Sequence, residues 1–549
     1  MLRPDPIGPI PTETVRISRA AFPKGNLYLQ LRDELGVLYS DADFASLFPT
    51  KGQPALPAWR LALVTVFQFL ENLTDRQAAD QVRARLDWKY ALGLELEHAG
   101  FDFSVLSEFR SRLLAGSAEQ VLLDKMLERF KTRGYLRLRG RQRTDSTHIL
   151  GAIRNLNRLE LIGETFRAAL NAVATENPEW LRPRIHPRWV EWYDHRVEER
   201  RLPKGVEARE QRAIQIGLDG FELLDSLKDE GDDTLRTLPA VLHLKQVWEQ
   251  QFSSDSQSGE VKWLPPGAAP PSSERSASPY DPETHFCQKR DTTWVGYKVH
   301  MTETCDPDLP GLITHVLVTN ATLADIRAVP LVHSALEKKQ LLPDRHLMDA
   351  GYTSIEIMQA TRSQYNVEMV GPTHQSSSWQ DGTPEAYGVD RFRIDWEKKE
   401  VYCPQNFLSR SWYELVNKQG ASFIRVEWNQ RTCERCPVRS LCTTATRAGR
   451  SLTLKPRVHH EALIQARKQE TAQDWKQLYA QRQGIEATLS QGVRRFDLRQ
   501  ARYWGEAKMR LQALSTAAAL NLTRWNAWLQ GIPRGPTRIA RFAQLVITA

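Results

Sequence analysis

The sequence predicts an α/β fold: a mixed β-sheet with flanking helices, preceded by an all-helical N-terminal domain and interrupted by two insertions. Three observations predict this fold. Residues 51–135 contain only helical patterns, with apolar side chains recurring at helical spacing. Residues 143–150, 292–304 and 311–322 have the composition and alternation of strands. Residues 325–370 then alternate helices with short apolar strands, an order typical of a sheet covered by helices.

The composition indicates a soluble protein with a polyanionic partner. The 549-residue chain has a formal net charge of +8 and clustered arginines, which favours nucleic acid over a membrane. The N-terminal residues lack the apolar run of a signal peptide, and no apolar run is long enough to cross a membrane. Six cysteines in a chain of this length do not make a disulfide framework. We therefore expect a reducing cytoplasm.

The N-terminal part divides into an arm with a short helix, residues 1–50, and a helical domain, residues 51–135. Within the helical domain we expect a buried helix over 57–69, a helix start near Asp75 and a turn at Gly93. Several short helices with a basic face are typical of helix-turn-helix-like DNA binding, while a helical domain with merely solvated arginines is the alternative. The cations expected on the polar faces are Arg76, Arg83, Arg85, Lys89, Arg110 and Arg112.

The first strand follows a basic stretch and presents an acidic residue. The segment RTDSTHIL reads as a strand that places Asp145 and Thr147 on one face. A helix N-cap or Asx turn is the alternative role for Asp145. Residues from about 152 to 290, which are helical in pattern and end in a Pro/Ser-rich linker or loop, form the first insertion.

A second aspartate lies where a short strand ends. The segment RHLMDAGYTS ends its apolar run at Asp349, and Gly351 permits a turn into the next helix. Open α/β sheets build their sites at such strand ends. A simple turn is the alternative.

The segment Tyr479–Arg502 is predicted to be one helix. Helical spacing places Tyr479, Arg482 and Glu486 on a single face, followed by a strongly cationic stretch that includes Arg494, Arg495 and Arg499. A carboxylate among cations suits a metal site beside a phosphate. An ordinary amphipathic helix is the alternative, although its Arg-before-Glu pair has the less favourable orientation for helix stabilisation.

The second insertion, about 372–460, contains four of the six cysteines. Cys433 and Cys436 form a Cys-x-x-Cys pair, Cys442 follows closely, and Cys403 stands apart. Thiols in this pattern suit one structural Zn²⁺, although the two-pair spacing of a zinc ribbon is missing. Unligated buried thiols are the alternative.

Together these elements provide two strand aspartates and a late helical glutamate, the ligand types that two-metal phosphoryl transfer requires. Mg²⁺ prefers hard oxygen ligands, and two ions can activate the attacking oxygen and stabilise the leaving one. The sequence contains no Ser/His/Asp triad motif and no P-loop.

On these residues the chain resembles bacterial insertion-sequence transposases of the DDE superfamily, in the branch with a Tyr-Arg-Glu helix signature. The matching motifs are RTDSTH, MDAGYTS and the Tyr479–Arg482–Glu486 spacing, and the N-terminal helices resemble the domain often found in front of such catalytic domains. A lysine is usual seven residues after the glutamate, but Val493 stands there, followed by arginines.

The resemblance implies an RNase H-like catalytic domain over residues 136–549, with the two insertions inside it. It implies that Asp145, Asp349 and Glu486 bind two Mg²⁺ or Mn²⁺ ions, and that Tyr479 and Arg482 hold DNA phosphate. Further DNA contacts are expected from seven arginines: Arg110, Arg139, Arg141, Arg143, Arg494, Arg495 and Arg499.

The implied partners are double-stranded DNA, both the terminal inverted repeats of the element and the target DNA, and a second copy of the chain. The implied location is the bacterial cytoplasm, in association with the nucleoid. Two other functions remain open: an RNase H-like nuclease without strand transfer, and an inactive DNA-binding remnant.

Overall fold

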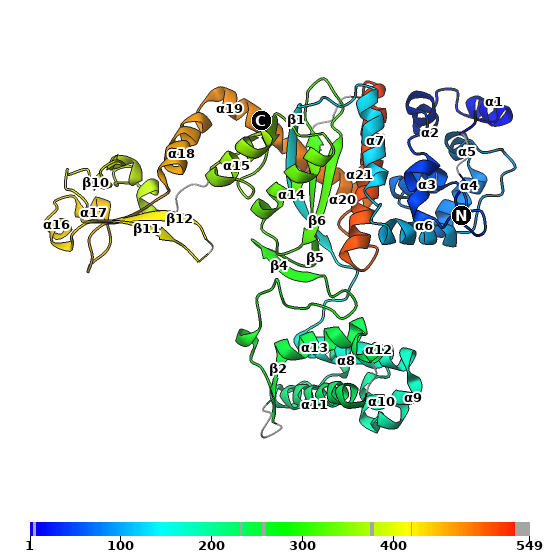
Figure 1. The fold of residues 1–549 in the computed structure, drawn as a ribbon, viewed down its shortest axis with the longest axis horizontal. Helices are drawn as coiled ribbons and strands as arrows, with labels where there is room; N and C mark the ends of the chain where they lie inside the picture. The colour runs from blue at the N-terminus through cyan, green and yellow to red at the C-terminus, as the bar shows by residue number, and fades with distance from the viewer. Residues whose placement is uncertain (4–6, 231–232, 255–259, 374–377, 419, 533–549) are drawn as a thin grey trace, which may run out of the picture. The chain divides into compact units, whose positions relative to one another are not determined.

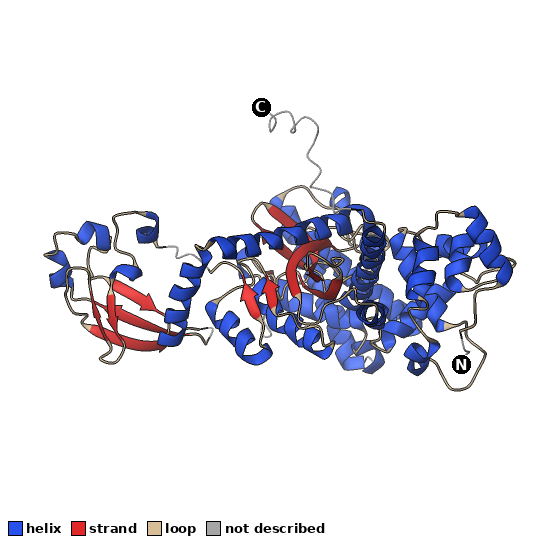
Figure 2. Cartoon of the chain, turned by 90° about the horizontal axis from the view of Figure 1, so that it is seen from above, coloured by secondary structure: helices blue, strands red, loops and turns tan. Residues whose placement is uncertain are grey.

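The computed structural model describes residues 1–3, 7–230, 233–254, 260–373, 378–418 and 420–532. The chain forms two compact units. Unit 1 comprises Met1–Leu342 and Gly484–Ala549, and unit 2 comprises Pro343–Gln483. Both units combine helices and strands (Figure 2), which confirms the predicted α/β class.

The N-terminal part of unit 1 is helical, as predicted. Helix α3 (Ala58–Leu70) is buried along almost its whole length, and helix α4 (Asp75–Ala84) begins at a capping box formed by Thr74 and Gln77. Gly93 ends helix α5 in the left-handed conformation that glycine adopts without strain. The remaining elements here are α1 (Thr12–Ala21), α2 (Leu27–Gln30), the π-helix η1 (Leu31–Leu35), the 3₁₀-helix η2 (Asp41–Leu47), α5 (Leu86–Leu92), α6 (Ser104–Ala115) and α7 (Val121–Thr132).

The segment expected to be an arm is more ordered than the sequence suggested. Helix α1 lies within it, and the Thr14 hydroxyl donates a hydrogen bond to the Leu94 carbonyl at 2.7 Å. This bond ties α1 to the turn that follows α5. Residues 12–47 therefore belong to the helical part of unit 1.

The sheet of unit 1 is built around one long strand. Strand β5 (Thr292–Thr304) pairs antiparallel with β1 (Arg141–Leu150), β4 (His285–Lys289) and β6 (Ile313–Asn320). Apolar residues of β5 and β6 are buried in the main core of the unit, which explains why both segments form strands.

Helices cover both faces of this sheet. Ser146 of β1 donates to the Asp325 carboxylate at 3.4 Å, at the start of helix α14 (Asp325–Lys338) on one face. On the other face, the Asn521 side chain of helix α21 (Glu506–Leu529) bonds to the backbone of Ile313 in β6. The sheet is therefore the middle layer of a three-layer arrangement.

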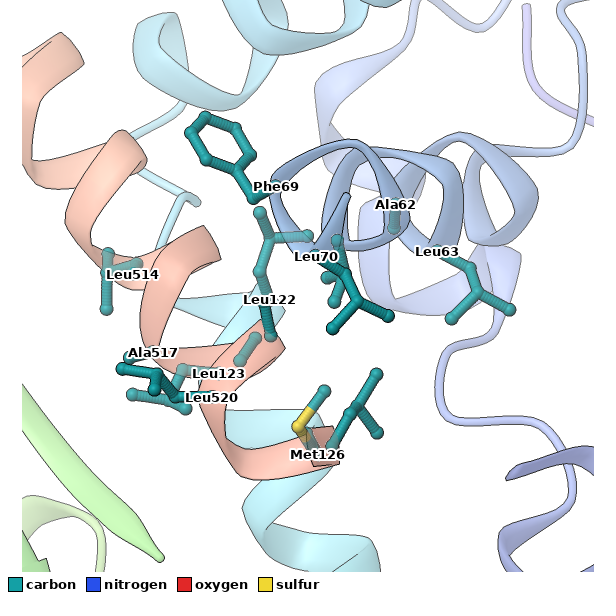
Figure 3. Close-up of a cluster of buried hydrophobic side chains, with 14 of the residues drawn as sticks. Ala62, Leu63, Phe69, Leu70, Leu122, Leu123, Met126, Leu514, Ala517 and Leu520 are labelled. Atoms are coloured by element: carbon teal, nitrogen blue, oxygen red, sulfur yellow. The ribbon is translucent and has the colours of Figure 1, made fainter. Parts of the chain in front are cut away.

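Helix α21 joins the sheet to the N-terminal helices through one continuous apolar core. Figure 3 shows Leu514, Ala517 and Leu520 of α21 beside Leu122 of α7 and Leu70 of α3. All five side chains are buried. The N-terminal helices are thus packed as part of unit 1.

The first insertion folds around a core of its own. It enters after β1 and returns to the sheet at β4 (Figure 1). Its core contains buried residues such as Phe166 and Trp248. The Pro/Ser-rich stretch is not only surface loop, since Ser276 and Ser278 are buried. Its elements are α8 (Arg158–Glu176), α9 (Pro178–Leu181), η3 (Arg182–Arg184), α10 (Pro187–Tyr193), η4 (Glu199–Arg201), α11 (Val206–Glu230), α12 (Asp233–Arg236), α13 (Pro239–Gln251), β2 (Phe252–Ser254), β3 (Val261–Trp263) and η5 (Pro266–Ala268).

Unit 2 begins with a strand–helix–strand segment. Strands β7 (Arg345–Leu347) and β8 (Glu368–Val370) are parallel and are connected by α15 (Ile355–Tyr365). The described strands thus include antiparallel and parallel pairs, as the predicted mixed sheet requires.

The second insertion follows in unit 2 and packs around residues that include Val401, Val426 and Trp428. Its elements and the helices after it are η6 (Trp379–Gly382), η7 (Val389–Arg391), β9 (Arg393–Asp395), β10 (Glu400–Tyr402), β11 (Ser411–Val416), β12 (Ser422–Glu427), α16 (Gln430–Glu434), α17 (Arg439–Cys442), β13 (Ser451–Leu454), α18 (Arg457–Glu470), α19 (Gln473–Ala480) and η8 (Gln481–Gln483). Among the described residues, no helix combines the length and apolarity needed to cross a bilayer.

Candidate active site

Strand β1 carries the first predicted carboxylate into the face of the sheet that also holds Arg143. Side chains alternate along a strand, so Arg143, Asp145 and Thr147 share one face. Asp145 is half-buried, and its Oδ1 accepts the backbone N–H of Ser146 at 2.7 Å. The expected strand placement of Asp145 is confirmed, and the helix N-cap alternative is excluded by its position inside β1.

Helix α20 (Gly484–Phe496) and the residues that follow it contact this face of β1 on both sides of Asp145. A Cβ on Gly484 would lie 2.5 Å from Nη2 of Arg143 and closer still to Nη1. Beyond the other end of the helix, Nη2 of Arg499 donates to the Thr147 hydroxyl at 3.3 Å. The residues after the helix also bond to the end of β1, because Leu150 N–H donates to the Arg499 carbonyl at 2.8 Å.

Glu486 lies in the first turn of α20 and is exposed. Because the first turn of α20 begins against Arg143 at Gly484, Glu486 belongs to the end of the helix that meets the part of β1 carrying Arg143 and Asp145. Unit 1 therefore brings two of the three predicted carboxylates, Asp145 and Glu486, to one region of the sheet.

The third predicted carboxylate, Asp349, belongs to unit 2 and follows strand β7 directly. Its Oδ1 accepts the N–H of Gly351 at 2.9 Å, and its carbonyl accepts the N–H of Tyr352 at 3.1 Å. Ser354 then caps helix α15. The predicted strand end, turn and helix are all present, and Asp349 has a turn role whatever else it does.

The single helix predicted over Tyr479–Arg502 is wrong. Helix α19 ends at Ala480, a 3₁₀ turn occupies residues 481–483, and α20 ends at Phe496, after which Asp497 has a φ of 52°. Tyr479 stacks on Trp475 with ring centroids 5.0 Å apart. The boundary between the two units falls between Gln483 and Gly484, inside the signature itself.

Two of the arginines predicted to contact DNA are buried in ion pairs. Arg143 is 7% exposed and bonds to Glu303 with Nη2 and Oε1 2.5 Å apart. Arg110 is 6% exposed and bonds to Asp75 at 2.6 Å. Lys89 is buried as well. The expectation that Arg110 and Lys89 lie on polar faces of the helical domain is wrong, because each charge is held by an acceptor inside the fold.

The other predicted cations differ in their surroundings. Arg494 and Arg495 on α20 are exposed. Arg141 is half-buried, with its Nε 3.8 Å from Asp306. Arg139 precedes β1 with a φ of 54° and is half-buried. Of these four cations, the exposed ones are therefore the pair in the last turn of α20.

A buried carboxylate that the sequence analysis missed lies next to this region. Glu303 of β5 is fully buried, and its Oε2 accepts the Thr488 hydroxyl at 2.6 Å and lies 2.5 Å from Nη1 of Arg524. Burial alone would raise the pKa of the Glu303 carboxyl, but the Arg524 and Arg143 guanidinium groups outweigh burial and hold the pKa below its ordinary value. A charged residue within the apolar alternation of β5 was the available signal.

The four cysteines of the second insertion line one small cavity, together with residues such as Trp428. Two of the sulfurs accept backbone hydrogen bonds: Phe407 N–H donates to Cys403 Sγ and Arg450 N–H to Cys433 Sγ, both at 3.4 Å. Burial raises the pKa of the Cys442 thiol to about 11. The fold thus brings Cys403 to the other three, which its distance in sequence had left open.

Carboxylate oxygens such as those of Asp145 and Glu486 suit a hard divalent cation. Within the described residues, however, no group of three or more His, Cys, Asp or Glu side chains is arranged to hold a metal ion. The donor type therefore fits Mg²⁺ or Mn²⁺, while a complete set of ligands is not assembled within unit 1.

Two segments of the chain match known protein families. Residues 17–112 match a transposase domain family (DUF772), and residues 402–525 match the transposase DDE domain. No curated protein matches the chain. The first match runs from within α1 to within α6, and the second includes Glu486 on α20 and the four cysteines. Both matched families are transposase families, and the two matches together support an insertion-sequence transposase of the DDE superfamily.

Proposed function

We propose that the protein binds the terminal inverted repeats of its own insertion sequence, hydrolyses the DNA strand at the element ends and joins the freed 3′-hydroxyl to target DNA. The observation that carries the proposal is the placement of Asp145 and Glu486 at one region of the unit 1 sheet, within a chain that matches the transposase DDE domain. Asp349, at a strand end in unit 2, is proposed as the third metal-binding carboxylate.

The chemistry is proposed to be two-metal phosphoryl transfer. Two bound Mg²⁺ or Mn²⁺ ions would activate the attacking oxygen and stabilise the leaving oxygen. The carboxylates of Asp145, Asp349 and Glu486 supply hard ligands and require no nucleophilic side chain. The exposed Arg494 and Arg495 are proposed to hold the phosphate backbone of the cleaved strand.

Tyr479 and Arg482 are proposed to hold phosphate near the scissile bond. Replacing Arg482 with alanine should then reduce cleavage more than DNA binding. Equal losses of cleavage and binding would contradict this role and would make Arg482 a general DNA contact.

The decisive experiment is cleavage of a labelled DNA that contains the flanks of the gene, in Mg²⁺ or in EDTA. We expect metal-dependent nicks at defined ends with the wild type and none with Asp349→Ala or Glu486→Gln. Glu368→Gln is the matched control, because Glu368 is a carboxylate of unit 2 that is exposed and paired with Arg345. Loss of cleavage in this control would show that the assay reports general damage.

The outcome also separates the two alternative functions. Scattered cutting without joined products would favour an RNase H-like nuclease that lacks strand transfer. Tight binding of the ends without any cutting, in Mg²⁺ and in Mn²⁺, would favour an inactive DNA-binding remnant.

We propose that the complex with DNA contains a homodimer, because two element ends must be brought together, and that it works in the bacterial cytoplasm in association with the nucleoid. Light scattering of the protein with and without a DNA end tests the first point. A complex with a single protein chain that still joins two ends would overturn it.

The second insertion is proposed to bind one structural Zn²⁺ through Cys403, Cys433, Cys436 and Cys442. The support is their shared cavity, in which the sulfurs of Cys403 and Cys433 accept backbone N–H bonds. The thiols would have to converge and lose their protons on binding. Metal analysis of the purified protein should find about one zinc per chain. Cys436→Ser should lose this zinc, and the control Cys287→Ser should keep it. Wild-type protein without zinc would favour unligated thiols.

A further inference from the structure

The carboxylate of Glu303 is the most heavily bonded buried acid beside the candidate site. It lies on β5 where the pairing with β6 shifts register, an irregularity that redirects side chains. Oε1 accepts Nε of Arg143 at 2.7 Å and lies 2.5 Å from Nη2 of the same side chain. Oε2 accepts the Thr488 hydroxyl and Nη1 of Arg524. Both oxygens are therefore fully used by donors from other elements.

These donors come from the three elements that must fit together around the site. Arg143 is on β1, Thr488 is on α20 and Arg524 is on α21. Arg524 also donates to the Thr488 hydroxyl at 2.7 Å and to the Gln491 side chain at 3.1 Å, so it forms two hydrogen bonds to α20. One carboxylate thus fixes the helix to the strand.

The network brackets the two carboxylates of unit 1. Arg143 precedes Asp145 by two residues on the same face of β1, and Thr488 follows Glu486 by two residues on α20. Arg143 also contacts the start of the helix at Gly484. A change in the network would therefore shift α20 along β1 and alter the spacing of Asp145 and Glu486.

We propose that Glu303 is a positioning residue, whose carboxylate locks α20 onto β1 and so sets the distance between the Asp145 and Glu486 carboxylates. The consequence for metal binding rests on the proposed function. The consequence for the position of α20 does not.

A purely stabilising contact would not need this arrangement. Buried ion pairs give little net stability over apolar packing, because desolvation offsets their attraction. Their hydrogen bonds are directional, however. The Arg143 guanidinium and the Thr488 hydroxyl can each donate to the carboxylate only over a narrow range of positions. The network therefore contributes mainly to the position of α20.

Glu303→Gln is the informative substitution, because it keeps the shape of the side chain and removes the charge that holds both arginines. Asp219→Asn is the matched control: Asp219 is also fully buried, lies in the first insertion, and accepts from the Tyr193 hydroxyl at 3.1 Å and from Gln215 at 3.3 Å. Its hydrogen bonds among the described residues all lie within the first insertion. Thr488→Val is a milder second variant, which removes one donor and leaves the ion pairs in place, should Glu303→Gln fail to fold.

Two readouts test the proposal on the full-length chain. Hydrogen exchange of peptides within residues 484–496 should become faster in Glu303→Gln and stay unchanged in Asp219→Asn. The Mg²⁺ concentration for half-maximal end cleavage should rise about tenfold in Glu303→Gln, the low end for residues that support metal ligands, while binding of the DNA ends stays within about threefold.

The possible results separate this proposal from the proposed function. Unchanged exchange in α20, for Glu303→Gln or for Thr488→Val if only that variant folds, would overturn the positioning role whether or not the protein cleaves DNA. Faster exchange with an unchanged Mg²⁺ dependence would overturn the link to the metal site. A wild type that shows no metal-dependent cleavage would refute the proposed function, and the exchange of α20 would still decide the positioning role.

Discussion

Replacing Gly484 with alanine would drive a methyl group into the Arg143 guanidinium. The new Cβ would lie 2.5 Å from Nη2 and nearer to Nη1, which is closer than such atoms can approach. Arg143 cannot withdraw freely, because Glu303 holds its Nε and Nη2 from the other side. Either the helix start moves away from β1 or the ion pair opens.

The size of the effect follows from these two choices. Overpacking of a well-packed site costs about 1–3 kcal/mol. Opening a buried ion pair costs about 3–5 kcal/mol when one charge is left alone, but Arg524 would still neutralise Glu303, so the lower range applies. Alanine is more favourable than glycine in a helix by up to about 1 kcal/mol, which offsets part of this cost. We therefore expect a net loss of about 2 kcal/mol in the free energy of unfolding.

Thermal unfolding followed by circular dichroism measures this loss, which should lower the midpoint by about 2 °C in a chain of this length. Gly205→Ala is the control, because a Cβ there meets nothing within 4 Å and should change stability by less than about 0.5 kcal/mol. In an Arg143→Ala background the Gly484 substitution should cost almost nothing, as the two residues are coupled through one contact. A Gly484→Ala protein that melts like the wild type would refute the claim that Arg143 is held in place.

Three further predictions concern charges. Replacing Arg494 and Arg495 with alanine should weaken DNA binding and reduce the slope of log affinity against log salt by about 2, measured by fluorescence anisotropy over a salt series; an unchanged slope would remove both from the DNA interface. Burial lowers the pKa of His243 to about 4, so the unfolded chain takes up a proton at a higher pH than the folded chain does. The contribution of this group to stability is therefore complete above pH 6.5 and falls by about 1.4 kcal/mol per pH unit towards pH 4. His243→Gln should flatten this slope in thermal melts measured across that pH range. Arg110→Ala should destabilise the protein by about 1–3 kcal/mol in the same assay, since it leaves the partly buried Asp75 without its main partner, and a neutral result would mean that Asp75 is resolvated.

Local signals explain which elements the sequence predicted well. The capping residue Thr74 and the left-handed Gly93 mark helix ends through contacts within a few residues, so α4 and α5 were recognisable. The alternation of β1 placed Asp145 correctly for the same reason. These features depend on chain neighbours, and sequence contains that information directly.

Partners far away in the chain explain the errors. The burial of Arg143 was not foreseen, because its partner, Glu303, is 160 residues away and nothing in the local pattern pairs them. Arg110 was misjudged in the same way, with Asp75 on another helix. The continuous helix over 479–502 was predicted from periodicity alone, which does not show that Gly484 must fit against a buried guanidinium. Cys403 could be joined to the other thiols only by the fold of the second insertion.

The first insertion has a consequence for how the sheet forms. Leu150 must find Gly296 across a very long loop, and closing such a loop is entropically costly and slow. The insertion ties its own two ends together, because Arg158 at its start bonds to the Leu264 carbonyl and Glu164 bonds to Tyr280 near its end. Since it also has a separate core, the insertion can form before the strands that follow it, β4 and β5, join β1 in the sheet. We therefore expect the first insertion to shorten the loop that must close before β1 pairs with β5.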